Sequence, residues 1–236
     1  MTLLTICQDA AKLIGITAPD AVTSSTDTST IQLEAVANQE GRAQVQKYRW
    51  EVLIQEGSHT TVAAESQGTM VSIASDFGRF SNQTIWNRTT NRRYYGPITD
   101  SEWQRILAVV SGGITNYFRI RGGKLLMHPT PTAGQSVKFE YVSKNWVDTS
   151  GGSTANADKF TGDSQTTVLE EELVVLGVVW RFLKLKGLPY DQQFIDYQNR
   201  VAEYSSHDGA SPIVRMGGTS SVILALNEPE GNYGGV

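Results

Sequence analysis

The side chains that could do chemistry are few in this sequence and lie far apart. None of the three histidines, His59, His128 and His207, has a cysteine, aspartate or glutamate partner at metal-ligand spacing. No Gly-x-Ser-x-Gly motif marks a nucleophile, and Gly123-Lys124 lacks the upstream glycine and the following serine or threonine of a phosphate-binding loop. The sequence therefore predicts no catalytic residue, no metal site and no cofactor.

An acidic triplet from Glu170 to Glu172 is a further candidate for metal binding. Consecutive residues of a helix point in different directions, so these carboxylates would not converge on one ion. At the start of a helix the same negative charges oppose the positive end of the helix dipole. We therefore interpret the triplet as the first turn of a helix.

A cluster of basic side chains between residues 86 and 95 is interleaved with aromatic rings. Rings that stack on bases and cations that pair with phosphates are typical of nucleic-acid contacts. Arginine and aromatic residues are also enriched at protein–protein interfaces, so an intersubunit surface is the alternative. The basic members are Arg88, Arg92 and Arg93, and the aromatic members are Trp86, Tyr94 and Tyr95.

A second basic face is expected on two adjacent strands that carry Arg119, Arg121 and Lys124, and the same two interpretations apply to it. Composition does not decide between them. The 20 basic and 24 acidic side chains give a net charge of -4, which requires neither a nucleic-acid nor a membrane partner. A protein that only lines a DNA path could carry this balance, because tight phosphate contacts would hinder passage.

The 236 residues, of which 39% are hydrophobic, suffice for one domain with an insertion or for two domains. The single Cys7 cannot form an internal disulfide and is interpreted as a small buried side chain. No signal peptide is visible, and the longest uncharged apolar run, Leu173 to Trp180, is too short to span a bilayer. We expect synthesis in a cytoplasm and no membrane partner.

Helical periodicity predicts two helices before residue 57. The first covers residues 2–14 and ends before Gly15. The second opens at Ser29, whose spacing to Gln32 is that of a capping box, and runs to about Gln55.

From His59 onward the period changes from helical to extended. Thr99 and Glu102 have capping-box spacing and open a short helix that runs through Val110. The expected strands are residues 60–64, 70–73, 84–86, 93–95, 117–121, 124–128 and 136–143, the last three forming a meander.

Two more helices follow a polar stretch. Residues 148–165 contain almost nothing apolar and are expected to form a flexible loop or a junction between domains. Thr167 and Glu170 have capping-box spacing, and the helix that they open ends near Gly187. A last helix is expected over residues 190–206.

Together these patterns predict an α+β fold. The N- and C-terminal helices, in residues 1–57 and 166–207, form a helical bundle. An antiparallel β-rich domain, residues 58–147, is inserted into it, and residues 208–236 form an extended C-terminal arm.

This order of elements resembles the head-to-tail adaptor proteins of tailed bacteriophages, which include connector or tail tubular A-like and head-completion proteins. Three structural motifs carry the likeness, and none is a catalytic signature. They are the Asp76-Phe77-x-Arg79 turn, the aromatic-Arg-Ile-x-Gly run at 118–122 and the Leu-Leu-x-x-Pro-x-Pro stretch at 125–131.

The resemblance implies a structural protein of the virion neck and not an enzyme. Its copies would form a ring, commonly of twelve, around a channel through which double-stranded DNA passes without sequence-specific binding. The helical bundle would dock beneath the portal protein, and the β-rich domain would face the tail or nozzle protein. Such a protein resides in the host cytoplasm during assembly and in the virion afterwards.

The resemblance also implies that the C-terminal arm extends onto the portal. Apolar patches in a glycine-rich terminal segment either fold back as strands or become ordered against another protein. The expected portal-binding residues are Pro212, Ile213, Val214, Arg215, Met216, Val222, Ile223, Leu224 and Leu226.

Two other functions remain as alternatives. A tail-tube or baseplate component would self-assemble through its β-rich region without a portal. A cell-wall-degrading virion enzyme, an activity credited to some adaptor relatives, would lose that activity when a carboxylate or His128 is replaced. The sequence contains no paired-carboxylate motif in support of the enzyme.

Overall fold

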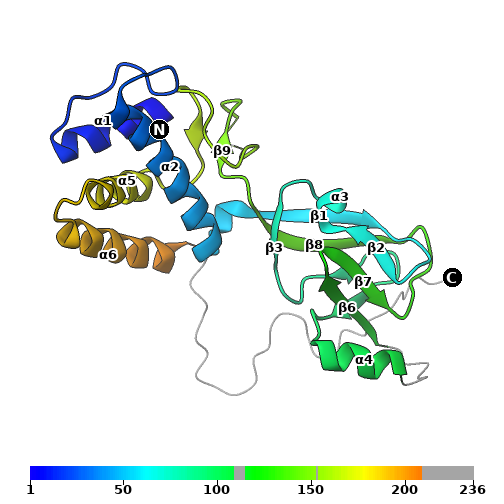
Figure 1. Cartoon of the computed structure of the whole chain (residues 1–236). Helices are drawn as coiled ribbons and strands as arrows, with labels where there is room; N and C mark the ends of the chain where they lie inside the picture. The colour runs from blue at the N-terminus through cyan, green and yellow to red at the C-terminus, as the bar shows by residue number, and fades with distance from the viewer. Residues whose placement is uncertain (109–114, 153, 209–236) are drawn as a thin grey trace. The chain divides into compact units, whose positions relative to one another are not determined.

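The computed structural model describes residues 1–108, 115–152 and 154–208. These residues form two compact units (Figure 1). The first, the helical unit, consists of Met1–Ile54 and residues 143–208. The second, the β unit, consists of the described part of residues 55–142.

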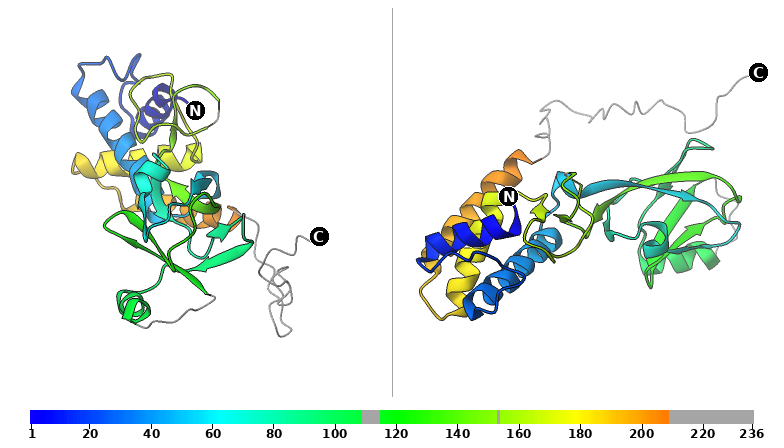
Figure 2. Two further views of the ribbon diagram at one scale, coloured as in Figure 1. Left: turned by 90° about the vertical axis from the view of Figure 1, so that its right-hand side faces the viewer. Right: turned by 90° about the horizontal axis from the view of Figure 1, so that it is seen from above.

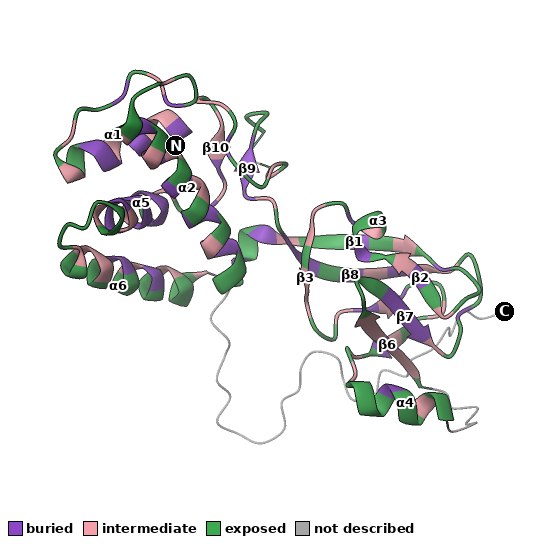
Figure 3. Ribbon diagram, in the orientation of Figure 1, coloured by how far each residue is buried: buried purple, intermediate pink, exposed green. Residues whose placement is uncertain are grey.

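Helix α5 (Glu171–Leu185) is the centre of the helical unit. It packs against α1 (Leu3–Ile14), α2 (Thr28–Lys47) and α6 (Asp191–His207), and Figure 2 shows this grouping from two further directions. Figure 3 shows α5 buried along most of its length, as its nearly continuous apolar surface predicts. Its buried residues are Leu173, Val174, Val175, Gly177, Val178, Val179, Trp180 and Phe182.

A buried carboxylate joins three of these helices. Glu40 on α2 is fully buried and forms an ion pair with Arg181 on α5. The Tyr197 hydroxyl on α6 donates to Glu40 Oε1 at 2.6 Å, and Gln44 Nε2 donates to the same oxygen at 2.8 Å. A Cβ on Gly177 would overlap the Glu40 carboxyl, so a glycine on α5 makes room for this network.

Capping contacts fix the ends of α1 and the start of α4. The Thr2 side chain accepts from Thr5 N at 3.3 Å, and Gly15 takes a left-handed φ of 84° after the end of α1. In α4 (Asp100–Ala108), Thr99 N donates to Glu102 Oε2 at 3.0 Å and Glu102 N donates to Thr99 Oγ1 at 3.4 Å. The helix over residues 2–14 and the capping box at residue 99 are thereby confirmed.

Helix α2 differs from its prediction at both ends. Asp27, not Ser29, is the N-cap, and its Oδ2 accepts from Thr30 N at 2.9 Å. The helix ends at Lys47, where Tyr48 becomes extended, and the chain continues through a short 3₁₀ turn, Glu51–Leu53, into the first strand. The expected continuation to Gln55 is therefore wrong.

The start of α5 also differs from its prediction. The helix begins at Glu171, and the Thr167 side chain accepts from Leu169 N at 3.0 Å instead of capping a helix. Thr167 belongs to a short strand, β10 (Thr166–Thr167), which pairs with β9 (Val147–Asp148). The first turn still carries acidic side chains, as the triplet predicted.

The segment between β9 and β10 has several anchors in the helical unit. Phe160 is 2% exposed and its ring lies 4.9 Å from that of Trp146. Asp163 accepts from Val22 N at 3.0 Å and from Thr23 N at 2.8 Å. These contacts join the polar segment 148–165 to the loop between α1 and α2.

The β unit is built on a curled, mostly antiparallel sheet (Figures 1 and 2). The strand order is β1-β8-β4-β5-β6-β7-β2, and β3 pairs with β8. The strands are β1 (Ile54–Thr60), β2 (Ser66–Thr69), β3 (Phe77–Phe80), β4 (Trp86–Asn87), β5 (Arg92–Tyr95), β6 (Asn116–Arg121), β7 (Lys124–His128) and β8 (Ser136–Ser143).

This topology confirms the α+β class and corrects three details. Strands β6, β7 and β8 are not a meander, because β8 pairs with β1, β3 and β4. The sheet is not wholly antiparallel, because β5 and β6 are parallel. Met70–Ile73 form the short helix α3 in place of a strand, since the Thr69 side chain caps it by accepting from Ser72 N at 3.2 Å.

The inward side of the sheet encloses the core of the β unit. Side chains from most of the strands meet there, and Phe80 stacks on Phe139 at a ring separation of 5.3 Å. The buried members are Met70, Ala74, Ile85, Tyr94, Phe118, Leu125, Met127, Val137, Phe139 and Tyr141.

Candidate functional site

The outward face of the sheet carries a row of basic and aromatic side chains. Residues directly opposite each other on neighbouring strands point to the same side of a sheet. Trp86 on β4 lies opposite both Arg93 on β5 and Lys138 on β8, and Tyr95 lies opposite Tyr117 on β6. The row, called here the basic–aromatic row, consists of Lys138, Trp86, Arg93, Tyr95, Tyr117, Arg119, Arg121 and Lys124.

Contacts within the β unit hold two arginines of the row in place. Arg93 Nη2 donates to the Gln83 carbonyl at 3.2 Å and to Gln83 Oε1 at 2.9 Å, and its guanidinium lies 5.3 Å from the Tyr95 ring centre. Arg119 forms an ion pair with Asp100 on α4, and its side chain is only 12% exposed. Both arginines are therefore fixed parts of the face.

The other basic side chains on or near the row differ in whether they have an acidic partner. Lys138 forms an ion pair with Glu56 on β1. Arg121 and Lys124, at the turn between β6 and β7, are exposed, as is Arg88 just after β4. Within the described residues these last three side chains form no ion pair.

The strand register separates the arginines that the sequence groups together. Arg93 belongs to the basic–aromatic row, whereas Arg92 lies opposite Asn87 and on the same side as Tyr94. Arg92 therefore lines a different feature, a polar pocket on the inward side of the sheet. Lys138 joins the row although sequence analysis did not select it, because strand pairing over a long separation places it there.

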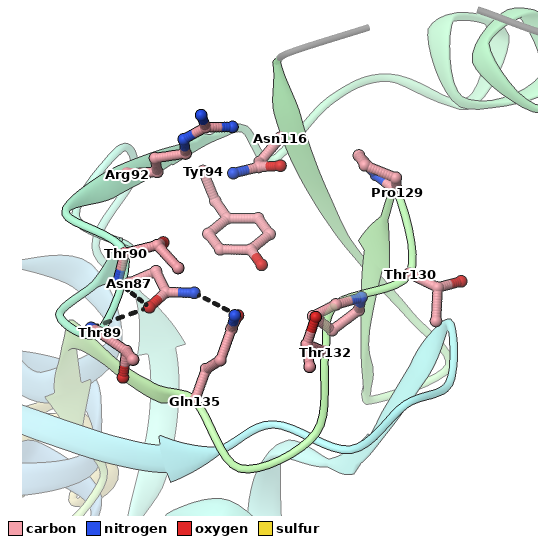
Figure 4. Close-up of a pocket in the computed structure, with 11 residues that line it drawn as sticks. Asn87, Thr89, Thr90, Arg92, Tyr94, Asn116, Pro129, Thr130, Thr132 and Gln135 are labelled. Carbon is pink, nitrogen blue, oxygen red and sulfur yellow. Dashed lines mark hydrogen bonds between the residues drawn. The ribbon is translucent and has the colours of Figure 1, made fainter. Parts of the chain in front are cut away.

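This polar pocket has a volume of about 370 Å³ and lies between the β4–β5 turn and the loop after β7 (Figure 4). The buried Tyr94 ring lies in its middle, with Arg92 and Asn116 at one rim. No local sequence signal marked this site, because its walls come from separate loops. The lining residues are Asn87, Thr89, Thr90, Arg92, Tyr94, Asn116, Pro129, Thr130, Pro131, Thr132 and Gln135.

The two units carry opposite net charges. Residues 55–142 contain nine basic and six acidic side chains, a net charge of +3. Residues 1–54 and 143–208 contain ten basic and sixteen acidic side chains, a net charge of -6. Residues 209–236 contribute the remaining -1 of the overall charge of -4, which is therefore divided between a basic β unit and an acidic helical unit.

The helical unit exposes several large apolar side chains. Leu13 in the last turn of α1 is 63% exposed, and Leu185 at the end of α5 is 56% exposed. The others in this unit are Ile31, Val52, Leu188 and Ile195. The predicted portal-binding residues from Pro212 to Leu226 lie outside the described residues.

Two kinds of site are missing from the part of the chain that the structure describes. No three histidine, cysteine, aspartate or glutamate side chains there gather closely enough to hold a metal ion. None of its helices has the length and apolar character needed to cross a membrane.

A family model described as SU10 adaptor protein matches residues 1–214, about nine-tenths of the chain. The chain belongs to the SU10 adaptor protein family. A comparison with curated proteins gives no match. Membership confirms the expectation of a bacteriophage adaptor, a virion component with a structural rather than a catalytic role. The surfaces described above are therefore the candidate functional parts of this adaptor.

Proposed function

We propose that this adaptor is a neck protein that assembles as a ring of twelve copies, joins the portal to the tail, and surrounds the channel for double-stranded DNA. Membership of an adaptor family supports a joining role. A protein that joins two different partners needs two different docking surfaces. The division into an acidic helical unit and a basic β unit provides two surfaces of different charge, and this observation carries the proposal.

The helical unit is assigned to the portal side. Its exposed apolar residues, such as Leu13 and Leu185, offer area that a protein partner can bury. Residues 209–236 add the arm, whose apolar patches from Ile213 to Met216 and from Val222 to Leu226 become ordered against the portal.

The β unit is assigned to the tail side and to neighbouring subunits. The basic–aromatic row combines rings with arginines that are already held in place, so little side-chain entropy is lost on contact. Arg121 and Lys124 lie at a turn, exposed and without an ion pair among the described residues. They can meet DNA phosphates briefly without reading sequence.

Mass photometry of the adaptor, alone and mixed with the portal ring of the same virus, tests this function. We expect a portal complex whose added mass equals twelve adaptor chains. The adaptor alone should stay small, because an arm that folds on binding needs its template. Formation of tubes without the portal would indicate a tail-tube protein, and an inert monomer at high portal concentration would refute the joining role.

Deletion of residues 209–236 tests the role of the arm. We expect the shortened adaptor to keep its helical circular dichroism and its cooperative unfolding, because the described cores lie in residues 1–208. Its affinity for the portal should fall by about tenfold or more through the loss of buried apolar area. An unfolded truncated protein would instead show that the arm is part of the core.

A further inference from the structure

The polar pocket of the β unit contains a positive charge and hydrogen-bond donors but no negative charge. Of its lining side chains, only Arg92 is charged, and none is a carboxylate. Asn116 supplies an amide, Tyr94 a phenol, and four threonines supply hydroxyl groups. Proline rings cover part of the remaining wall. A pocket with one cation, several hydrogen-bond donors and no anion favours a ligand that carries negatively charged oxygen atoms.

The floor and one wall of the pocket are fixed by hydrogen bonds. Asn87 is 2% exposed, and its Oδ1 accepts from Thr89 N at 3.0 Å and from Thr90 N at 3.1 Å. Its Nδ2 donates to Gln135 Oε1 at 2.7 Å, as the dashed lines in Figure 4 show. Tyr94, also 2% exposed, stands beside this group.

The opposite wall, the loop after β7, is fixed by Thr61. The Thr61 hydroxyl donates to the Thr132 carbonyl at 2.6 Å and accepts from Gln135 N at 3.1 Å. Both walls are therefore held before any ligand arrives, which lowers the entropy cost of binding.

Arg92 is the charged side chain of the pocket, and no acidic side chain of the pocket pairs with it. Arg119 and Lys138 each have a carboxylate partner on the outward face, whereas Arg92 is exposed and forms no ion pair within the described residues. A single planar guanidinium matches one carboxylate, which it can bind through two parallel hydrogen bonds.

Duplex DNA fits this pocket less well than an acidic side chain does. DNA presents phosphates one after another along its backbone and is held by several cations in a series. The pocket has one cation, and its floor residues Asn87 and Tyr94 are almost fully buried. The outward face, with Arg121 and Lys124 exposed, is the surface that a duplex can reach.

We propose that the pocket between the β4–β5 turn and the loop after β7 receives an acidic side chain from the helical unit of a second copy of this chain. The net charge of -6 on the helical unit, against +3 on the β unit, makes one copy complementary to the next. The inference rests on the proposed ring. Within that ring, the contact sets the register between neighbouring subunits.

Charge reversal at Arg92 tests the contact. Arg92→Glu should raise the adaptor concentration needed for half-maximal ring formation on the portal by about tenfold or more, because two carboxylates would then face each other. Arg105→Glu is the matched control, since Arg105 is an exposed residue of α4 in the same unit and lies outside the pocket. Equal effects of the two variants would overturn the proposal.

Two substitutions of Thr132 distinguish the effect of a negative charge in the pocket from the effect of a larger side chain. The Thr132 side chain is exposed, and only its carbonyl accepts the anchoring hydrogen bond from Thr61. Thr132→Glu places the chain's own carboxylate near Arg92 and should block ring formation, whereas the similarly sized Thr132→Gln should impair it far less. Normal rings with Thr132→Glu would overturn the proposal, and circular dichroism verifies that both variants are folded.

Photo-crosslinking identifies the occupant directly. A photoreactive residue at position 130, at the pocket rim, is irradiated in a mixture of ¹⁵N-labelled and unlabelled adaptor with portal rings. Crosslinks between differently labelled copies that reach residues 1–54 or 143–208 would support the proposal. Crosslinks to portal, tail protein or DNA would overturn it.

Failure of the proposed function has a different signature. If the unchanged adaptor forms no ring on the portal, the neck role fails. Crosslinking of the concentrated adaptor alone then tests whether the pocket contacts a second copy. A mixed-label crosslink to the helical unit would support the contact even so, and its absence would overturn it.

Discussion

At the scale of single residues, the buried Glu40 carboxylate joins three helices through its hydrogen bonds and ion pair. It satisfies donors from α5 and α6 as well as from its own helix, and its partners neutralise the charge. Removal of one member of such a group leaves the others buried without a partner, which costs more than the group contributes in net stability.

Tyr197→Phe should lower the free energy of unfolding by about 1–3 kcal/mol at pH 7, because Glu40 and Gln44 lose a buried hydrogen-bond partner. Urea denaturation measures the change. Tyr190→Phe is the control, since the Tyr190 hydroxyl forms no hydrogen bond within the described residues and its ring lies near Trp180 and the Lys184 ammonium. Equal losses of unfolding free energy in both variants would show that the hydrogen bonds of the Tyr197 hydroxyl add no stability of their own.

The same tyrosine gives the network a pH dependence. Burial, followed by the negative charge of Glu40, raises the pKa of Tyr197 above its ordinary value. A raised pKa means that folding favours the protonated hydroxyl, so its contribution is complete below about pH 10 and is lost as the pH rises further. The alkaline loss of stability should therefore be smaller in Tyr197→Phe than in the unchanged protein.

At the scale of elements, the polar segment between β9 and β10 depends on a few side chains that act as anchors. Asp163 joins this segment to the loop between α1 and α2, and Phe160 joins it to Trp146. Asp163 is a polar residue within a polar run, so composition alone predicted only a flexible loop or a domain junction for residues 148–165.

Asp163→Ala should release this anchor without unfolding the helices. We expect amide hydrogen exchange at Val22 and Thr23 to accelerate about tenfold, since both N–H groups lose their acceptor. Asp158→Ala is the control, because the exposed Asp158 side chain makes no hydrogen bond among the described residues. Unchanged protection at residues 22 and 23 would contradict the anchoring role.

Acid should have the same local effect. Burial alone would raise the pKa of Asp163, but hydrogen bonds from the backbone of Thr23 and Val22 lower it overall. A lowered pKa stabilises the fold above the ordinary carboxyl pKa of about 4, and this stabilisation is lost as the pH falls through the folded-state value. Protection of the two amides should therefore decline in acid.

At the scale of the whole molecule, the two units have separate cores. The buried members of the hydrophobic core cluster of the β unit lie between Met70 and Tyr141, while α5 organises the helical unit. The β unit begins with β1 and ends with β8, and these two strands are neighbours in the sheet. Backbone hydrogen bonds join Thr61, just after β1, to Gly134 and Gln135, just before β8, so the two strands run antiparallel and the ends of the insertion are close together.

A short glycine–serine linker in place of residues 55–142 should therefore leave a folded helical unit. Its Glu40 network should survive, and thermal unfolding followed by circular dichroism should remain cooperative. The excised residues 55–142 should fold separately and bind a cation exchanger, as their net charge of +3 predicts. Loss of cooperative unfolding in either piece would show that its core needs the other.

Local signals made several elements predictable from the sequence. The bounds of β7 and β8 agree with the expected strands, and the capping box at Thr99 operates through residues three apart. Prediction failed where two local signals competed. Asp27 and Ser29 can each cap α2, and the apolar run from Met70 to Ile73 suits a strand as well as a capped helical turn.

By itself, the sequence determined the α+β class, the positions of most helices and the lack of a catalytic motif, because these follow from residue types and short spacings. Only the tertiary structure decided which arginines share a surface. Arg92 and Arg93 are neighbours in the chain but lie on opposite sides of the sheet, and Lys138 joins Arg93 across β4. Strand register and loop packing bring together residues that are far apart in sequence. A local sequence pattern therefore cannot predict which of these residues share a surface.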